Sequence, residues 1–217
     1  MFARRGHQGA VSLTQTTELG TLYTPDEIRA VVDVAHRHGL PVHLDGSRIA
    51  NACAALDLTL REMVLDTGID VLSLGGTKNG AMLAEAVVVL NTERVREVEY
   101  LRKTPTQLTS KMRFISAQLV ALHDGDLWLE NARHANAMAA RLAQELQAID
   151  GVRLTQTPQA NGVFVVPPDD AARRLMERVP SYFWNEPIGE ERLMCSFDTS
   201  EGDADEFVAM VRDELAR

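Results

Sequence analysis

The chain has 217 residues, of which 45% are hydrophobic and 24% are charged, an ordinary composition for a globular protein of one or two domains. Its 22 basic and 31 acidic side chains give a formal net charge of −9, which argues against a nucleic-acid partner because no Lys/Arg cluster offsets the repulsion from phosphates. No apolar run could span a bilayer and no signal peptide is recognisable, so we expect no membrane partner and a cytoplasmic location.

The first part of the chain predicts strands that alternate with helices. A strand at 9–17 precedes a helix that begins after Thr24, because Thr24 is a favoured N-cap residue and Pro25 fits the first helical position. Gly39 ends this helix. Such alternation is typical of parallel βαβ units in an α/β architecture. The elements that follow are a strand at 41–45, a helical stretch at 48–65 and strands at 69–76 and 84–91.

The second part of the chain has a different pattern. Two long helical segments are expected at about 107–122 and 127–149, and short strands and helices follow after Gly151. We therefore expect a large α/β domain at 1–150 and a small C-terminal α+β domain at 151–217, the latter built on an antiparallel sheet. The predicted elements of the small domain are strands at 152–156, 162–166, 181–184 and 192–197 and helices at 169–179 and 204–216.

Ionisable side chains follow two neighbouring strands of the predicted large domain. Asp45 ends the strand in HLDGSR, and Arg48 lies on the turn after it. Lys78 follows the next strand, in the glycine-rich turn GGTKNG. Ligands bind at the carboxyl ends of the strands in open α/β sheets, and adjacent parallel strands end at the same edge. We therefore expect Asp45 and Lys78 to lie near one another.

An acid and a lysine in this arrangement suit pyridoxal phosphate (PLP). Lys78 can form a Schiff base with the cofactor aldehyde, and Asp45 can pair with the protonated pyridine nitrogen. The glycines beside Lys78 let the backbone approach a bulky ring closely. Taken alone, however, Lys78 also fits a solvated surface lysine, Asp45 a turn former and Arg48 a surface ion pair. The turn is not a P-loop, because an asparagine follows the lysine.

A metal site has weaker support. His43 and Asp45 lie on one face of a strand, but no third ligand is apparent. Cys53 and Cys195 have apolar neighbours and no metal-ligand spacing, so we interpret them as small core residues. We therefore expect no metal.

Longer stretches of the sequence carry a resemblance to a known family. They include TPDEI, HGLPVHLDGSRIANA and DVLSLGGTKNGAMLAEAVV, and they continue through SKMRFISAQL, NARHANAMAARLA, ANGVFVV and RLMCSFDTS. These stretches span essentially the whole chain, and the HLDG-x-R and TK motifs at this spacing are the most specific part. The chain resembles the threonine aldolase and β-eliminating lyase family, whose members are fold-type I PLP enzymes.

The resemblance implies a fold and a set of site residues. The fold is a partial PLP-transferase large domain, aspartate aminotransferase-like with a mostly parallel sheet, followed by a small α+β domain. Lys78 is implied as the Schiff-base lysine and Asp45 as the partner of the pyridine nitrogen. Arg48 is implied to lie beside the cofactor, near its ring oxygen or the substrate.

The resemblance also singles out an arginine of the small domain. Arg192, just before the strand LMCSF, matches the arginine that holds the substrate carboxylate. A guanidinium suits this role because it binds a carboxylate through two parallel hydrogen bonds. Without the resemblance, Arg192 would be interpreted as a surface ion pair with Glu190 or Glu191.

The implied reaction is the cleavage of a β-hydroxy-α-amino acid of the threonine or allo-threonine type to glycine and an aldehyde. β-Elimination, racemisation and transamination use the same electron sink, so a PLP-dependent β-eliminating lyase is an alternative. A second alternative is a non-catalytic, truncated homologue that acts only in oligomerisation. Members of the family assemble as homo-oligomers, which implies a dimer or a tetramer.

Two departures from the family pattern stand out. Ser47 lies where the family often has alanine. In addition, no stretch before Val11 could supply the family's phosphate-holding turn or its ring-stacking histidine. We therefore expect an incomplete large domain with weak cofactor affinity and weak or no activity.

Overall fold

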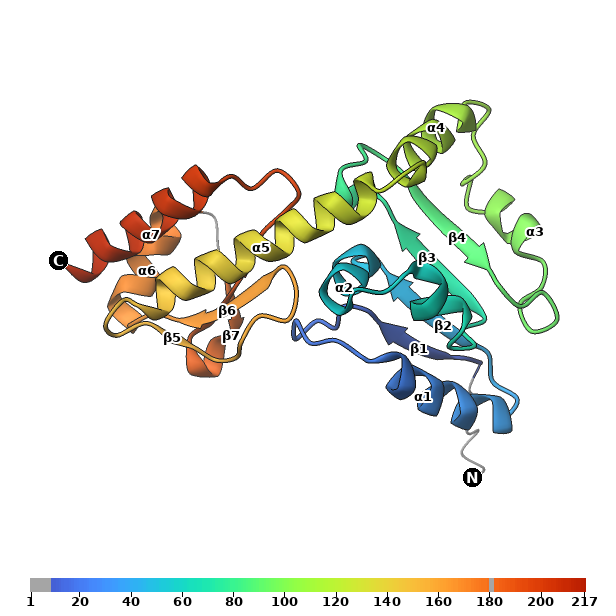
Figure 1. The fold of residues 1–217 in the computed structure, drawn as a ribbon, viewed down its shortest axis with the longest axis horizontal. Helices are drawn as coiled ribbons and strands as arrows, with labels where there is room; N and C mark the ends of the chain where they lie inside the picture. Colours follow the sequence, from blue (N-terminus) through green and yellow to red (C-terminus); the bar gives the residue numbers. More distant parts are fainter. Residues whose placement is uncertain (1–8, 180–181) are drawn as a thin grey trace, which may run out of the picture.

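The structure is a computed structural model, and it describes residues 9–179 and 182–217. The described residues form two four-stranded sheets that lie in separate parts of the molecule, with a long helix running between them (Figure 1). The first sheet has the strand order β1 (Val11–Thr14), β2 (Val42–Gly46), β3 (Val71–Gly75) and β4 (Glu85–Val89). The second has the order β5 (Arg153–Leu154), β6 (Gly162–Val166), β8 (Glu190–Met194) and β7 (Phe183–Asn185).

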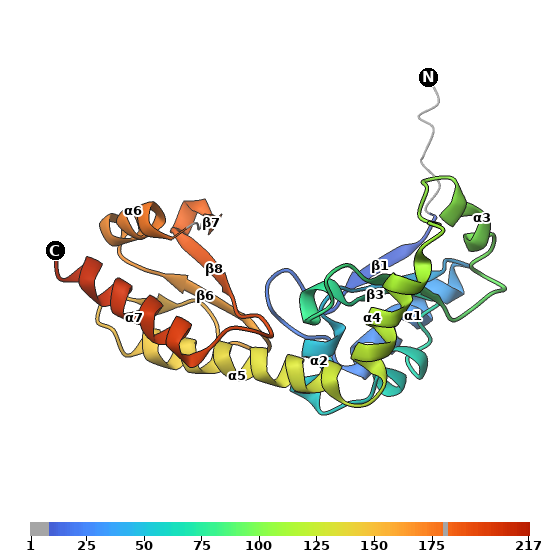
Figure 2. The same cartoon turned by 90° about the horizontal axis from the view of Figure 1, so that it is seen from above.

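Helices α1 and α2 pack against the first sheet and α5 against the second, and α5 extends from one part to the other (Figure 2). No helix in the described ranges is both long and apolar enough to cross a bilayer. The α-helices are α1 (Pro25–Arg37), α2 (Ile49–Leu56), α3 (Val98–Lys103), α4 (Met112–His123), α5 (Leu127–Gln147), α6 (Asp169–Arg178) and α7 (Glu201–Leu215). Shorter helical turns are η1 (Arg61–Leu65), η2 (Thr77–Asn79) and η3 (Glu186–Ile188).

The first sheet is mostly parallel, as predicted. β1 pairs with β2 and β2 with β3 in parallel, but β4 runs antiparallel to β3. The prediction of parallel βαβ units was therefore wrong for β4. The reason is the short connection at 76–84, which holds only the turn η2 and cannot provide the crossover that a parallel strand needs.

The faces of the first sheet differ because side chains alternate along each strand. Val42 and Leu44 of β2 are fully buried and pack against Ile28 of α1 and Ile49 of α2, in the main hydrophobic cluster of this part. The opposite face carries polar side chains, among them Asp45. The functional candidates therefore lie on the face that does not form the core.

The start of α1 confirms the sequence prediction in detail. Thr24 is the N-cap, its side chain accepts a hydrogen bond from the backbone N–H of Glu27, and the Glu27 carboxylate accepts one from Thr24 in return. This reciprocal pair is a capping box. Hydrogen bonds from Thr24 hold the pKa of the Glu27 carboxyl below its ordinary value. At the other end, Gly39 has φ +72°, which suits a residue without a Cβ.

Other boundaries differ from the prediction. The helical stretch at 48–65 divides at Asp57, which has a left-handed backbone (φ 52°), into α2 and the π-helical turn η1. The helix predicted from 107 begins at Met112, and the short helix α3 was not predicted. None of the residues of α3 is buried, so it carries little of the apolar periodicity from which helices are predicted.

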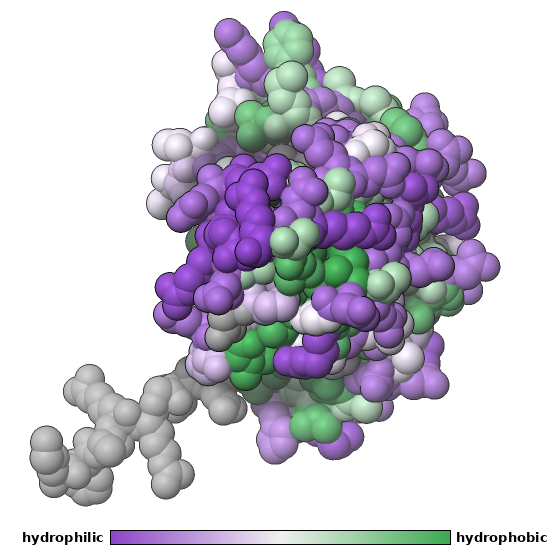
Figure 3. All heavy atoms as spheres, turned by 90° about the vertical axis from the view of Figure 1, so that its left-hand side faces the viewer, coloured by the Kyte–Doolittle hydropathy of each residue, from purple (hydrophilic) through white to green (hydrophobic). Residues whose placement is uncertain are grey.

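The second sheet is antiparallel, as predicted. Its core contains Val163 and Val165 of β6, Leu142 of α5 and Val208 of α7. The strand predicted at 181–184 is found as β7, and the first of these residues lies outside the described residues. Helix α5, which ends just before residue 150, contacts α2 of the first part as well as α7 of the second. The domain boundary predicted at residue 150 therefore stays a prediction. The end of the molecule formed by this part presents hydrophilic side chains mixed with small hydrophobic patches (Figure 3).

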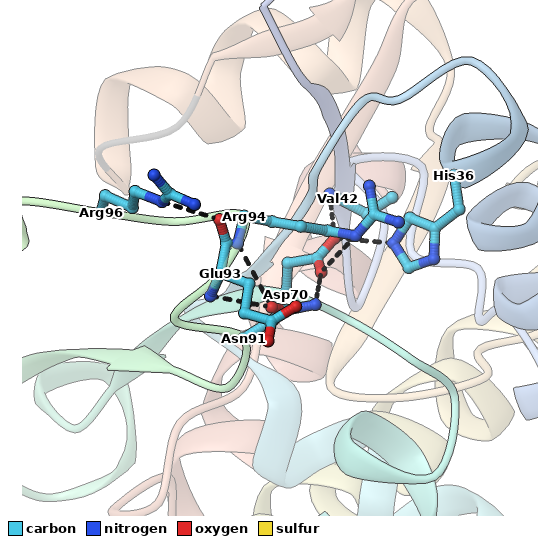
Figure 4. A network of polar contacts seen from close by, with 7 residues as sticks. All are labelled: His36, Val42, Asp70, Asn91, Glu93, Arg94 and Arg96. Carbon is cyan, nitrogen blue, oxygen red and sulfur yellow. Dashed lines mark hydrogen bonds and ion pairs between the residues drawn. The ribbon is translucent and has the colours of Figure 1, made fainter.

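A buried carboxylate ties the first part together at the start of its strands (Figure 4). Asp70 is fully buried and accepts hydrogen bonds from the backbone N–H of Val42 at 2.7 Å and from the Asn91 amide at 2.9 Å. His36 Nε2 lies 2.8 Å from Oδ2, the oxygen that also accepts the Val42 N–H, and Arg94 Nε lies 3.8 Å from Oδ1. Asp70 therefore links α1, β2 and the segment after β4.

Candidate active site

Asp45 and Lys78 lie at the same edge of the first sheet. Asp45 is on β2 and pairs with Ser73 of β3, and β3 then ends at Gly75. The chain continues directly into η2, which contains Lys78. Burial raises the pKa of the Asp45 carboxyl and the Ser47 hydrogen bonds lower it, and the positive charge of nearby Lys78 lowers it further. The structure thus brings together the pair that the strand order predicted.

The Asp45 carboxylate is held by the turn that follows it. Its Oδ1 accepts hydrogen bonds from the backbone N–H of Ser47 at 2.9 Å and from the Ser47 hydroxyl at 2.5 Å. Burial raises the pKa of Asp45, but the Ser47 hydrogen bonds and the charges of Lys78 and His43 outweigh it, and the net pKa lies below the ordinary value. Asp45 is thus ionised at neutral pH. Its Oδ2 accepts no hydrogen bond from the described residues and can serve a ligand.

His43 lies two residues before Asp45 on the same face of β2. Its Nδ1 is 2.8 Å from the Ser12 hydroxyl of β1, and its Nε2 is 2.8 Å from the Ser73 hydroxyl of β3. Both ring nitrogens therefore have neighbours on the adjacent strands. Within the described ranges, no three His, Cys, Asp or Glu side chains are placed to hold a metal.

The turn that carries Lys78 packs closely against its surroundings. A Cβ at Gly75 would lie 2.7 Å from Ser47 Cα, and one at Gly76 would lie 2.6 Å from the Ala84 carbonyl oxygen. Glycine is thus needed here for close backbone approach. The side chain of Lys78 itself is exposed. The turn is therefore fixed while the amine stays accessible.

Two asparagines anchor this turn to the long helix α5. The Asn79 amide donates a hydrogen bond to the carbonyl oxygen of Trp128 at 2.8 Å. The Asn131 amide donates one to the carbonyl oxygen of Asn79 at 2.9 Å. Helix α5 therefore sets the position of the Lys78 backbone.

Arg48 lies at the N-terminal end of α2, directly after the Asp45 turn. Burial lowers the pKa of its guanidinium, the positive charge of Arg192 lowers it further, and the charge of Asp45 acts in the opposite direction. Arg48 thus interacts with a carboxylate of its own sheet and with a cation of the second sheet. Two guanidinium groups near one another favour an anionic ligand.

Arg192 extends from β8 toward the first part of the molecule. Its guanidinium carbon lies 3.7 Å from the ring centroid of Trp184, and its Nη1 donates a hydrogen bond of 3.4 Å to the carbonyl oxygen of Glu18. Its Nε is buried and has no hydrogen-bond partner among the described residues. Arg192 therefore links the second sheet to the segment after β1, on the side where Arg48 lies.

The sequence did not indicate Trp184 as part of this arrangement. Trp184 lies on β7, the strand that pairs with β8, so the hairpin pattern could have suggested a contact with Arg192. However, the pairing is irregular between Phe183 and Asn185, which shifts the register. Such a shift moves a side chain relative to its expected partner, and sequence alone does not show it.

The side chains at this edge fit PLP. The cofactor requires a primary amine for its aldehyde, a carboxylate for its ring nitrogen and cations for its anionic groups or those of a substrate. Lys78 offers an exposed amine, and Asp45 offers an ionised carboxylate with one oxygen available. Arg48 and Arg192 offer the positive charge.

Comparison with known proteins places the chain in a family. The family model described as beta-eliminating lyase matches residues 3–169, which is more than half of the chain. The chain belongs to the β-eliminating lyase family. This confirms the resemblance that the HLDG-x-R and TK motifs carried.

Two relatives of this chain have names that state a reaction more specifically than the family description does. It is 40% identical over 202 residues to the low specificity L-threonine aldolase of Pseudomonas sp. (strain NCIMB 10558), covering 93% of this chain and 58% of the relative. It is 41% identical over 189 residues to the protein of the same name from Pseudomonas aeruginosa, covering 87% and 55%. The chain thus spans little more than half the length of these relatives.

A solved structure of a related enzyme has the same fold as this chain. The threonine aldolase of Leishmania major superposes with a TM-score of 0.84 at 28% sequence identity, over 94% of this chain and 60% of that one. The predicted fold class is thereby confirmed: a fold-type I α/β part with a mostly parallel sheet, followed by a smaller part with an antiparallel sheet.

Proposed function

We propose that this chain is a threonine aldolase-like, PLP-dependent lyase that cleaves a β-hydroxy-α-amino acid to glycine and an aldehyde. The observation that carries the proposal is the meeting of Asp45 and Lys78 at one carboxyl edge of the sheet. The names of the relatives at about 40% identity favour aldol cleavage over other reactions of such a site.

Each proposed site residue has a physical task in this reaction. PLP, when bound, supplies the electron sink for the bond that breaks. Lys78 holds the cofactor through its accessible amine and is available to move a proton nearby. Asp45, ionised because its pKa is lowered, keeps the pyridine nitrogen protonated. Arg48 lies beside the cofactor, and Arg192 holds the substrate carboxylate, which orients the bond between Cα and Cβ.

The proposed reaction is tested by the products formed from L-threonine and L-allo-threonine at a large excess of PLP. Aldol cleavage releases glycine and acetaldehyde in equal amounts, and Lys78→Ala should abolish their formation. Equal loss of activity in Lys103→Ala, a lysine of the exposed helix α3, would instead point to a general loss of folding.

The family description keeps β-elimination as a second candidate. That reaction releases ammonia and a keto acid rather than glycine, so the same product analysis separates the two. If neither set of products forms at saturating PLP, the chain is a non-catalytic homologue. Its proposed function is then oligomerisation alone.

We also propose that the chain self-associates as a dimer or a tetramer in the cytoplasm, with an amino acid as its small-molecule partner. Size-exclusion chromatography with light scattering measures the oligomer directly. A mass of two or four chains supports the proposal, and a monomer at micromolar concentration contradicts it.

A further inference from the structure

Three side chains of the second sheet form a stack that ends at the candidate site. Phe164 of β6 is the cross-strand partner of Arg192 on β8, so both lie on the same face. The rings of Phe164 and Trp184 have centroids 6.4 Å apart and planes at 74°, an edge-to-face contact. The guanidinium of Arg192 lies over the Trp184 ring, 3.7 Å from its centroid.

The segment after β1 closes the other side of this stack. Gly20 has φ +72°, and a Cβ there would lie 2.5 Å from Cε2 of Phe164. The carbonyl oxygen of Leu19 accepts a hydrogen bond from the Gln156 amide, and that of Glu18 accepts one from Arg192. The stack therefore lies against the turn that follows β1.

The polar contacts of Arg192 do not by themselves fix its guanidinium. Its hydrogen bond to Glu18 is long, at 3.4 Å, and its buried Nε finds no partner in the described part of the chain. The positive charges of Arg192 and Arg48 repel one another. The close contact with Trp184 is therefore the interaction that holds the guanidinium in place, since a cation is attracted to the face of an indole.

We propose that Trp184 is the positioning residue for Arg192 and thereby sets the affinity of the site for the substrate carboxylate. The inference rests on the proposed function, because it takes Arg192 as the carboxylate-binding group. With the indole ring against it and only one long hydrogen bond from Nη1 to Glu18, the guanidinium keeps donors for the hydrogen bonds that a carboxylate accepts. Trp184 also limits the rotation of a long side chain, which lowers the entropy lost on binding.

The test is an NMR titration with glycine, the simplest α-amino acid, in protein labelled on the arginine side chains and supplied with excess PLP. The variants are Trp184→Leu, Trp184→Phe and Arg192→Lys. Trp128→Phe is the matched control, because the chain has 2 tryptophans and the Trp128 ring packs against His123, whereas Arg192 packs against Trp184. The Nε–H signal of Arg192 reports the ring current of Trp184 without any substrate.

We expect Trp184→Leu to move the Arg192 Nε–H signal and to weaken glycine binding roughly 3- to 30-fold, the range for a partly desolvated cation–π contact. Trp184→Phe should restore part of the affinity because it keeps an aromatic face. Trp128→Phe should leave both the signal and the affinity unchanged. An intact Arg192 signal or wild-type affinity in Trp184→Leu would overturn the inference.

The remaining outcomes separate this inference from the proposed function. If Arg192→Lys binds glycine as well as the wild-type protein, Arg192 does not hold the carboxylate, and the inference fails with that assignment. If glycine binds as described but threonine is not cleaved, the inference holds and only the proposed reaction fails.

Discussion

Asp45 shows how one side chain serves both a local turn and a ligand site. One of its oxygens holds the turn through Ser47, while the other accepts no hydrogen bond from the described residues. The turn former that the sequence suggested and the cofactor partner are therefore compatible functions of the same carboxylate. Ser47, the departure from the family's frequent alanine, contributes the hydroxyl that helps to keep Asp45 ionised.

Replacing Asp45 by asparagine tests its proposed electrostatic function. Asp45→Asn keeps the size of the side chain but removes its charge, so we expect turnover to fall about 10²- to 10³-fold, as for other preorganised electrostatic contacts. Steady-state kinetics with threonine measures the effect. Ser47→Ala should have a smaller effect in the same direction, and an unchanged rate in Asp45→Asn would refute the assignment.

The pH dependence of activity follows from the same carboxylate. Its pKa in the folded protein lies below the ordinary value, so the charged form persists at neutral pH and is lost only as the pH falls through that lowered pKa. We expect Asp45 to cause no loss of activity between about pH 5 and 7, because an unperturbed Asp already titrates near 3.9. An acid limb within that window that disappears in Asp45→Asn would contradict the lowered pKa.

At the scale of elements, the sequence predicted those features that depend on residues close together in the chain or on the order of the strands. The capping box of α1 could be predicted because Thr24, Pro25 and Glu27 are adjacent in sequence and act through their own backbone. The site pair Asp45 and Lys78 could be predicted because successive parallel strands end at one edge.

Features that depend on distant partners could not be predicted. The burial of Asp70 requires Asn91 and Arg94, which lie beyond the next two strands. The contact of Trp184 with Arg192 depends on an irregular strand pairing. Sequence patterns report local periodicity, whereas these contacts follow from tertiary packing.

The capping box allows a stability prediction for α1. Thr24→Ala removes the side chain that accepts the Glu27 N–H, and we expect it to lower the free energy of unfolding by about 1 kcal/mol. Chemical denaturation measures the difference. Thr24→Ser, which keeps the hydroxyl, should recover most of it, and no loss in Thr24→Ala would show that the cap does not contribute.

The end of α7 provides an acid-sensitive contact. The Glu214 side chain is fully buried and meets Arg178 Nη1 at 2.9 Å, Arg174 Nε at 3.0 Å and Arg217 Nη1 at 3.3 Å. The hydrogen bond from Arg178 is the main cause that lowers the pKa of Glu214. A lowered folded-state pKa contributes stability above the unfolded value, and this stability is lost as the pH falls through the folded pKa.

We therefore expect the melting temperature to fall on acidification below about pH 4, near the unfolded pKa of a glutamate. Glu214→Gln should lower the melting temperature at neutral pH and make it less sensitive to acid. Asp213→Asn, at an exposed neighbouring position, is the matched control. Equal acid sensitivity of wild-type protein and Glu214→Gln would disprove this contribution.

At the scale of the whole molecule, the contact between the two parts depends on the turn after β1. Gly20 and Gly39 both have φ +72°, but a Cβ at Gly20 would meet Phe164 at 2.5 Å, whereas one at Gly39 would have open space. Both alanine variants therefore carry the same backbone strain, and only Gly20→Ala collides with the second part. The difference between them isolates the contact from the strain.

We expect Gly20→Ala to destabilise the protein by about 1–3 kcal/mol more than Gly39→Ala, the usual cost of overpacking. Thermal or chemical unfolding of the two variants measures this difference. Gly20→Ala should also weaken glycine binding, because Phe164 supports Trp184. Equal stability of the two variants would show that the parts do not pack as described.

The proposed function depends above all on Lys78, which we propose to hold the cofactor aldehyde at the sheet edge that it shares with Asp45. The chain contains three lysines, Lys78, Lys103 and Lys111, so borohydride reduction with PLP followed by peptide mass spectrometry can distinguish them completely. We expect the reduced cofactor to be attached to Lys78, and Lys78→Arg to abolish the attachment. Attachment to Lys103 or Lys111 instead, or none to Lys78 at saturating PLP, would contradict the proposal.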